Sequence, residues 1–354
     1  MKSAVIPQFV SERYVTSRVS LGTLIMVFGA SCGGSSNSLD NACLTLARAE
    51  CALRQACSDE IYPAGVNVIA NYGDQETCIN RQQQACLNNA SAPQSGTNLG
   101  QILRCANEYP GWSCTDFFDN AANPPTDCSP AGTLSDGQTC TFNAQCASTF
   151  CGGIKNANCG TCAEKPQDGD SCATSPCAPG QECLTEASGA MVCRVRLPVG
   201  NDTCTSDAPC QVFASCVGSS ATDPTQVGVC MSTNQTLGGP CGDSNPEPAC
   251  EGSLGLACLG PTGSKTCQQV AYVTAGQCGT LPGGLRAECI DGDCFTPTGP
   301  AAVTDTNATC LAKVNDGAAC DTQLGHLCQT PARCVVAAGT TQGICVFPNA
   351  TACN

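Results

Sequence analysis

Apolar and cysteine side chains recur every three to four residues between residues 39 and 128, which predicts a helical region. The first helix is expected over residues 39–57 with Asp40 as its N-cap, and the second begins after Asp74 and runs to Asn88. Two shorter helices are expected to follow, the third beginning at Thr97 or Asn98 and the fourth carrying Phe117 and Phe118.

The cysteine spacing in this region suggests how two of its helices are joined. Seven residues separate Cys43 from Cys51, and seven separate Cys78 from Cys86. Two antiparallel helices with this matched spacing would be linked by the disulfides Cys43–Cys86 and Cys51–Cys78. Other pairings stay open, because the eight cysteines of the region can be connected in many ways.

The pattern changes after Pro124-Pro125, a pair that cannot continue a helix. Residues 129–354 repeat a unit in which a glycine is followed by four loosely spaced cysteines. Successive units start only 32 to 42 residues apart, so each is too short for a hydrophobic core and is expected to carry two disulfides instead. The first cysteines of the units are Cys140, Cys172, Cys204, Cys241, Cys278 and Cys320.

Turn-forming residues fill the space between these cysteines, which predicts short hairpins and little helix. We expect an elongated array of about six modules in which each module contacts only its neighbours. The first module is assigned Cys140, Cys146, Cys151 and Cys159, which leaves Cys162 and Cys353 as additional cysteines.

Composition supports this architecture. Aromatic residues make up 4% of the chain and charged residues 12%, whereas 35 of the 354 residues are cysteine. A chain with so few large side chains has little core to bury, and a cysteine content this high is typical of exported disulfide scaffolds. The predicted fold class is therefore small and disulfide-rich. An α-helical, cysteine-bridged region (39–128) precedes an array of irregular and short β-hairpin cysteine modules (129–354).

The N-terminus has the features of an export signal over residues 1–31. Basic residues precede an apolar run at 21–30, which is too short to cross a bilayer as a helix. Small residues then lead into Cys32, and this arrangement resembles the bacterial lipobox, in which the cysteine becomes an acylated N-terminus. Residues 32–38 would then hold the lipid attachment site and a flexible tether.

A plain secretory signal, cleaved near Ala30 or Ser31, is the alternative, because the lipobox usually has leucine at the position of Gly29. The parity of the cysteines favours either lipidation of Cys32 or an intermolecular disulfide at that residue. Without Cys32, 34 cysteines remain, and an even number allows complete pairing.

Two resemblances follow from these motifs. The segment from Gly137 to Cys162 resembles the Dickkopf N-terminal cysteine-rich pattern, although it lacks the adjacent Cys-Cys pair of the animal proteins, and their signalling activity is not carried over. The whole layout is similar to cysteine-rich predicted lipoproteins of myxobacteria, which implies a lipoprotein of the cell envelope without implying a specific activity.

Charge and residue types exclude several function classes. The net charge is −14 and the basic residues form no cluster, which argues against a nucleic-acid partner. The single histidine, His326, rules out a multi-histidine metal site, and neither a metal nor another cofactor is expected. Cys159 and Cys162 have the Cys-x-x-Cys spacing of disulfide oxidoreductases, but a structural role inside the cysteine repeat is favoured over a redox pair.

These observations favour a non-catalytic, surface-anchored protein that acts in adhesion, recognition or envelope structure. Its expected location is the cell envelope, as an outer-membrane or cell-surface lipoprotein, or the medium if Cys32 is not lipidated. The expected partners are a protein or glycan at the cell surface, with a lipid anchor and no transmembrane span in the mature form. An extracellular protease inhibitor is the alternative function, and a secreted enzyme is the third and least favoured one.

Overall fold

The structure is a computed structural model. It describes residues 38–58, 65–119, 122–186, 188–205, 209–219, 226–233, 235–242, 249–261, 263–281, 284–297, 299–300 and 307–353. The predicted export signal, Cys32 and the tether through residue 37 lie outside the described residues. None of the described helices combines the length and the apolar character that a membrane-spanning helix needs.

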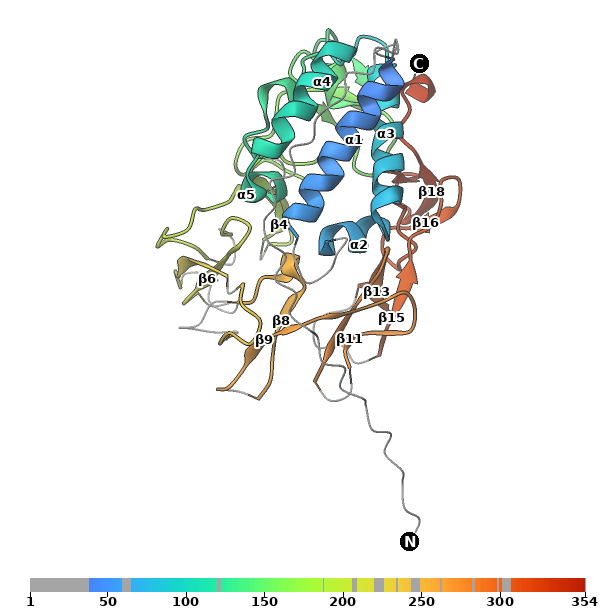
Figure 1. Cartoon of the computed structure of the whole chain (residues 1–354). Coiled ribbons are helices and arrows are strands. Elements are labelled where there is room, and N and C mark those ends of the chain that lie inside the picture. Colours follow the sequence, from blue (N-terminus) through green and yellow to red (C-terminus); the bar gives the residue numbers. More distant parts are fainter. Residues whose placement is uncertain are drawn as a thin grey trace, which may run out of the picture. The chain divides into compact units, whose positions relative to one another are not determined.

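The described residues of the helical region form five α-helices (Figure 1). They are α1 (Leu39–Ala56), α2 (Val66–Tyr72), α3 (Gln75–Ala90), α4 (Leu99–Glu108) and α5 (Cys114–Phe118). Helix α1 packs against both α3 and α4. The 3-10 turns Tyr109–Gly111 and Thr126–Cys128 follow α4 and α5. The helical part of the predicted fold class is confirmed, and α2 is an additional helix that the sequence pattern did not indicate.

Side-chain caps set the starts of four of these helices. Ser38, Asp74, Asn98 and Ser113 each accept the backbone N–H of the residue three positions later, which satisfies a donor that has no partner inside the helix. The predicted N-cap Asp40 is wrong, since Ser38 caps α1 and Asp40 lies in its first turn. An acidic side chain in the first turn still favours the helix through the macrodipole.

Cysteines and a few aromatic side chains form the core of the helical region. The buried residues of α1 are Ala42, Cys43, Ala47 and Cys51. The structure joins α1 to α3 by the disulfides Cys43–Cys86 and Cys51–Cys78, the same two pairs that the matched spacing suggests. The bridges Cys57–Cys114 and Cys105–Cys128 hold the later helices. Tyr109, Trp112 and Phe117 pack edge to face beside them.

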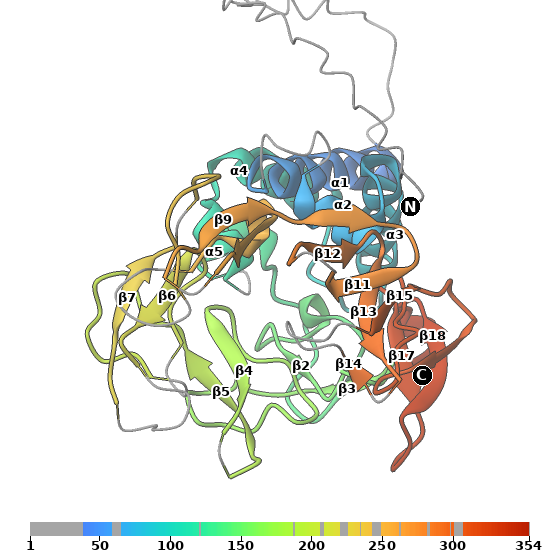
Figure 2. The same cartoon turned by 90° about the horizontal axis from the view of Figure 1, so that it is seen from below.

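Short antiparallel strands make up the modules, as the sequence predicts. Two small sheets have three strands, with the orders β1-β3-β2 and β16-β18-β17. Three modules contain the hairpins β4-β5, β6-β7 and β8-β9, of which the first two are seen in Figure 2. The fifth module belongs to a six-stranded sheet with the order β10-β12-β11-β15-β13-β14, in which β10 and β12 are parallel.

The strand bounds are as follows: β1 (Thr139–Cys140), β2 (Cys151–Gly152), β3 (Gly160–Cys162), β4 (Gln181–Thr185), β5 (Met191–Val195), β6 (Ala214–Val217), β7 (Val229–Ser232), β8 (Leu256–Leu259) and β9 (Thr266–Gln269). The later strands are β10 (Ala271–Val273), β11 (Gln277–Thr280), β12 (Arg286–Cys289), β13 (Gly292–Thr296), β14 (Gly299–Pro300), β15 (Ala308–Ala312), β16 (Ala319–Asp321), β17 (Arg333–Val336) and β18 (Gln342–Val346). Three further 3-10 turns are Asn143–Gln145, Gly252–Leu254 and Ala350–Cys353.

All six modules share one disulfide pattern, in which the first cysteine bonds the third and the second bonds the fourth. The 1–3 bridges are Cys140–Cys151, Cys172–Cys183, Cys204–Cys216, Cys241–Cys258, Cys278–Cys294 and Cys320–Cys334. The 2–4 bridges are Cys146–Cys162, Cys177–Cys193, Cys210–Cys230, Cys250–Cys267, Cys289–Cys310 and Cys328–Cys345. The sulfur atoms take the place of a hydrophobic core, because each module's buried cluster consists mainly of its own cysteines.

The third and fourth cysteines of each module stand opposite each other on antiparallel strands without bonding to each other. The cross-strand pairs are Cys151 and Cys162, Cys183 and Cys193, Cys216 and Cys230, Cys258 and Cys267, Cys294 and Cys310, and Cys334 and Cys345. Each of these side chains instead bonds a cysteine earlier in its module, which lies in a preceding loop or, for Cys140, Cys278, Cys289 and Cys320, in a preceding strand. The disulfides therefore fix the earlier part of each module to its strand pair.

A glycine turn begins each module. In the last module, Gly317 has a φ of +81°, a conformation that an L side chain rarely adopts. Its N–H donates to the carbonyl of Cys345 at 2.7 Å, and the N–H of Cys345 donates to Ala318 at 2.9 Å. The same reciprocal pair links Gly137 to Cys162, Gly169 to Cys193, Gly200 to Cys230 and Gly238 to Cys267.

One disulfide connects the first module to the C-terminal end of the chain. Cys159 bonds Cys353, 194 residues away, whereas Cys162 is the fourth cysteine of the first module. The predicted assignment of Cys159 to that module is therefore wrong. The expectation that each module contacts only its neighbours is also wrong, because the two ends of the array are covalently joined.

The helical region also contacts the last module directly. Arg81 of α3 makes a bidentate ion pair with Asp316, at 2.9 and 3.1 Å. It also donates to the carbonyls of Thr330 at 2.6 Å and Gln329 at 2.9 Å. Its guanidinium lies 5.0 Å from the centre of the Phe347 ring. We refer to these contacts as the Arg81 latch.

Candidate binding pocket

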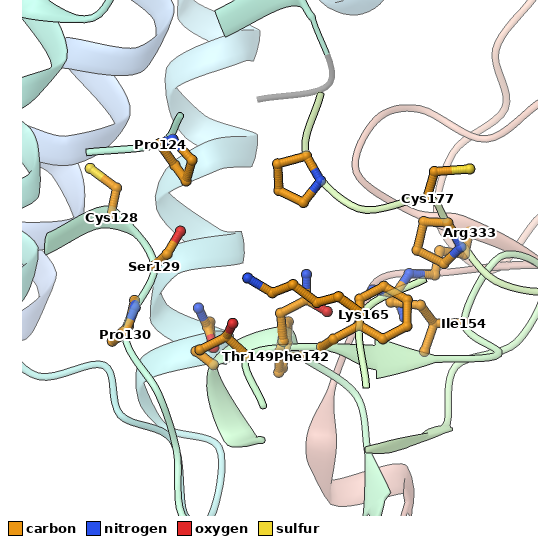
Figure 3. Close-up of a pocket in the computed structure, with 16 residues that line it drawn as sticks. Pro124, Cys128, Ser129, Pro130, Phe142, Thr149, Ile154, Lys165, Cys177 and Arg333 are labelled. Carbon is orange, nitrogen blue, oxygen red and sulfur yellow. The ribbon is translucent and has the colours of Figure 1, made fainter. Parts of the chain in front are cut away.

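A pocket of about 420 Å³ lies among segments that are far apart in the sequence (Figure 3). Its volume falls in the range of small-molecule sites. The lining residues are Asn89 of α3; Pro124, Cys128, Ser129 and Pro130 of the linker; Phe142, Asn143, Ala144, Thr149, Phe150 and Ile154 of the first module; Lys165, Pro176, Cys177 and Pro179; and Arg333 of β17.

The pocket walls combine polar side chains with apolar ones, and the apolar ones are conformationally restricted. Four prolines and two phenylalanines contribute to them. Two of the prolines belong to the linker and two to the second module, next to Cys177, which its disulfide to Cys193 holds in place. Proline side chains and disulfide-fixed loops lose little conformational entropy when a ligand binds, so these walls are pre-organised.

Gln145 fixes the turn that carries Phe142 against the helical region. Its buried side-chain oxygen accepts the N–H groups of Thr141 and Phe142, at 2.8 and 3.1 Å. Its side-chain amide donates to the carbonyl of Pro93 at 2.9 Å. The side chain thus satisfies three backbone groups and holds this wall in place.

Arg333, the first residue of β17, supplies a positive charge to the pocket. Its guanidinium donates to the carbonyls of Thr141 at 3.3 Å and Asn158 at 3.5 Å. Burial lowers the pKa of Arg333 to about 10, because desolvation disfavours the charged form. The side chain is still charged at neutral pH.

Partial burial without a carboxylate partner distinguishes Arg333 from the other arginines in the described part of the chain. Six of them form an ion pair with aspartate or glutamate: Arg54, Arg81, Arg104, Arg194, Arg196 and Arg286. Arg48 is exposed to solvent. Arg333 is partly buried, and no carboxylate of a described residue lies within ion-pair distance of it.

Lys165 supplies a second positive charge. In Figure 3 its side chain lies between Ser129 and Pro130 on one side and Ile154 and Arg333 on the other. No aspartate or glutamate is among the lining residues, although the chain as a whole has 29 acidic and 15 basic residues. The pocket is therefore a cationic site in an acidic protein.

The Cys159–Cys353 disulfide lies next to the residues that hold Arg333. Asn158 donates to the carbonyl of Asn349 at 3.1 Å and accepts the N–H of Asn349 at 3.3 Å. The hydroxyl of Thr141 is 2.9 Å from the sulfur of Cys353. Since Thr141 and Asn158 are the two acceptors of Arg333, the bridge supports one end of the pocket.

The candidate residues from the sequence, Cys159, Cys162 and His326, are not among the residues that line the pocket. Cys159 and Cys162 do not form a redox pair, because each is bonded to a different cysteine, Cys353 and Cys146 respectively. All 34 described cysteines are in disulfides, so clusters of three cysteine sulfurs within the modules offer no free thiolate to a metal. His326 is exposed and does not line the pocket.

The pocket itself was not predicted from sequence. Its lining residues span 89 to 333 and form no local motif. The one available signal was the cluster of prolines on both sides of the first module, which the sequence pattern indicates only as loops. Comparison with known proteins adds no assignment: no family model matches the chain, no curated protein matches it, and no solved structure matches it.

Proposed function

We propose that this chain is a non-catalytic recognition protein of the cell surface, exported by its N-terminal signal and held at the membrane by a lipid on Cys32. The single observation that carries the proposal is the pre-organised pocket, whose walls come from the helical region, the linker and three modules. Pre-organised, disulfide-fixed loops favour binding because little conformational entropy remains to be lost.

The cysteine chemistry supports export and argues against thiol catalysis. Seventeen disulfides use 34 of the 35 cysteines, which requires an oxidising compartment. The remaining cysteine is Cys32, so lipidation would leave no free thiol. The outer-membrane location and the surface ligand are parts of the same proposal.

The anchoring is tested by intact mass and thiol counting on the native protein, extracted with detergent from its own cells. We expect no free thiol, a chain that begins at Cys32, and the added mass of acyl chains. A Cys32→Ser variant should be released in soluble form. An unacylated N-terminus in the membrane-bound protein would contradict the lipid anchor.

Recognition is tested separately by coating beads with the native full-length protein and measuring their adhesion to intact cells. Reduced and alkylated protein is the matched control, because it has the same composition without the loops held in place. Adhesion by the native form alone supports surface recognition. Equal adhesion by both forms would point to non-specific contact and overturn it.

A further inference from the structure

We infer that the pocket binds a compact organic acid, with its carboxylate on the guanidinium of Arg333 and its aromatic or aliphatic body against the proline and phenylalanine walls. This inference rests on the proposed recognition function and specifies the chemical class of the ligand. Charge, hydrogen-bonding capacity and the chemistry of the walls all favour such a ligand.

Arg333 carries a positive charge that no neighbouring anion compensates. Removing water from a guanidinium disfavours its charged form, and an anion beside it offsets this cost. The other partly buried arginines of the described chain have such an anion. Arg333 has only two backbone carbonyls. Its lowered pKa reflects this deficit, and the cost is fully present below about pH 10, where the group is charged. A bound anion would supply the missing partner.

The guanidinium of Arg333 also has N–H donors beyond those that its two carbonyl acceptors use. A guanidinium has five N–H donors, and the two carbonyl acceptors occupy one on each terminal nitrogen. The remaining donors suit a carboxylate, which arginine binds through parallel N–H···O bonds. Lys165 adds a second ammonium charge, on a flexible stem, among the lining residues.

The chemistry of the walls bears on the body of the ligand. Phe142, Phe150, Ile154 and the prolines around them offer no charge, so they favour an apolar body over a second anionic group. A polyphosphate or sulfated polymer would place several charges against these apolar surfaces and is disfavoured. A monoanion with a ring or a short hydrocarbon chain can pair its charge with Arg333 and pack its apolar part against the walls.

Another hollow of about 270 Å³ shares Asn89, Phe142 and Arg333 with the pocket but also includes Glu50. Two further hollows of the described structure fit this chemistry less well. The larger one of about 1090 Å³ lies over β8 and β9 and includes Arg286, but Glu288 is in the same lining and pairs with that arginine at 2.9 Å. The other, of about 400 Å³, contains Asp293 and Glu288 together with Lys313 and Arg286. In both, Glu288 already lies beside Arg286.

The test uses the native full-length protein in detergent and titrates 3-phenylpropanoate, with isothermal calorimetry and ligand-observed NMR as readouts. The neutral amide of the same acid is the matched control ligand. We expect the acid to bind about tenfold or more tightly than the amide, since a charge-assisted bond is lost in the amide. Binding should weaken as the pH rises through about 10, where Arg333 loses its proton.

Variants separate a binding role from a structural one. Arg333→Met should reduce acid binding about tenfold or more while the seventeen bridges still form, because a similar apolar side chain replaces an unpaired charge. Arg333→Lys keeps the positive charge but lacks the planar pair of N–H donors, so this variant should bind the acid with intermediate strength. Lys165→Ala should weaken binding modestly, and Lys155→Ala, another exposed lysine that does not line the pocket, should leave it unchanged.

The results that overturn the inference are specific. Equal binding of the acid and the amide, equal binding by wild type and a correctly bridged Arg333→Met, or no binding of the acid at millimolar concentration would each reject the carboxylate site. The bead adhesion test does not depend on this ligand. Failure of the pocket inference alone therefore leaves adhesion to cells intact, whereas failure of both assays removes the recognition function itself.

Discussion

Because the modules have little hydrophobic core, the conformation of a single residue can determine local structure. Gly317 is one example, because its positive φ and its bond to Cys345 define the start of the last module. No atom lies within 4 Å of the position where a Cβ would be added, so crowding is not the constraint. Only the backbone conformation requires glycine here.

We predict that Gly317→Ala destabilises the last module locally by about 1 kcal/mol, the cost of a left-handed conformation for an L residue. Hydrogen exchange measures this directly. The amide of Cys345, which donates to Ala318, should exchange about fivefold faster. Gly111→Ala is the matched control, since that glycine also has open space around it but no positive φ. Equal effects of the two substitutions would refute the conformational explanation.

The sequence could indicate where glycines and cysteines recur, but not which cysteine completes each module. Cys159 and Cys162 are both within reach of the first module by spacing. The distinction depends on strand register, because Cys162 lies opposite Cys151 whereas Cys159 precedes β3. Register is set by how the strands pair in the folded module, which cysteine spacing alone does not specify. Arg333 was missed because its neighbours come from distant segments.

At the level of elements, helix periodicity and capping residues predicted most of the helical region. Asp74 and Asn98 stand at the predicted starts of α3 and α4 and cap them. Helix α2 was missed because it has only seven residues, and Val66, Val68 and Ile69 are β-branched. A helix this short is stabilised by packing rather than by its own propensity, and Val68 and Tyr72 are fully or nearly fully buried.

The Arg81 latch joins helix α3 to the last module. We expect Arg81→Ala to lower the free energy of local opening at the contact with α3 by about 2 kcal/mol, because Asp316 and two carbonyls lose their donor. The amides of Val314 and Gln329, which bond across this segment, should exchange faster.

Arg48→Ala is the control for the latch, because Arg48 is an exposed arginine on α1. It should leave exchange in the last module unchanged. If Arg81→Ala also leaves those amides unaffected, the latch contributes nothing to holding the module, and its ion pair behaves like an ordinary surface pair.

For the whole molecule, the most consequential bond is Cys159–Cys353. Closing a loop of this length restricts the unfolded chain strongly, although the disulfides inside the loop already shorten it. We predict that the double variant Cys159→Ser/Cys353→Ser loses about 2–4 kcal/mol of stability and exchanges faster around Asn158 and Asn349. Acid binding in the pocket should weaken too, since Thr141 and Asn158 hold Arg333.

A second double variant, Cys172→Ser/Cys183→Ser, provides the comparison. It removes a bridge with a sequence separation of only 11 within one module. Its effects should be confined to residues near β4 and β5 and should spare the amides around Asn158. A similar distribution of fast exchange in both variants would mean that Cys159–Cys353 has no special role in joining the ends of the array.

The interleaved bridges also determine what a protease can detach. In a 1–3, 2–4 pattern, a single backbone cut anywhere between the first and fourth cysteines leaves both pieces tied by a disulfide. Cuts between modules are spanned by Cys159–Cys353, and cuts from 43 to 128 by the bridges of the helical region. Within the stretch from Cys43 to Cys353, only the segment between Cys128 and Cys140 is crossed by no bridge. A molecule cut once between Cys43 and Cys353 thus stays covalently in one piece almost wherever it is cut, and cleavage between Cys128 and Cys140 is the one cut in that stretch that frees the modules covalently from the helical region.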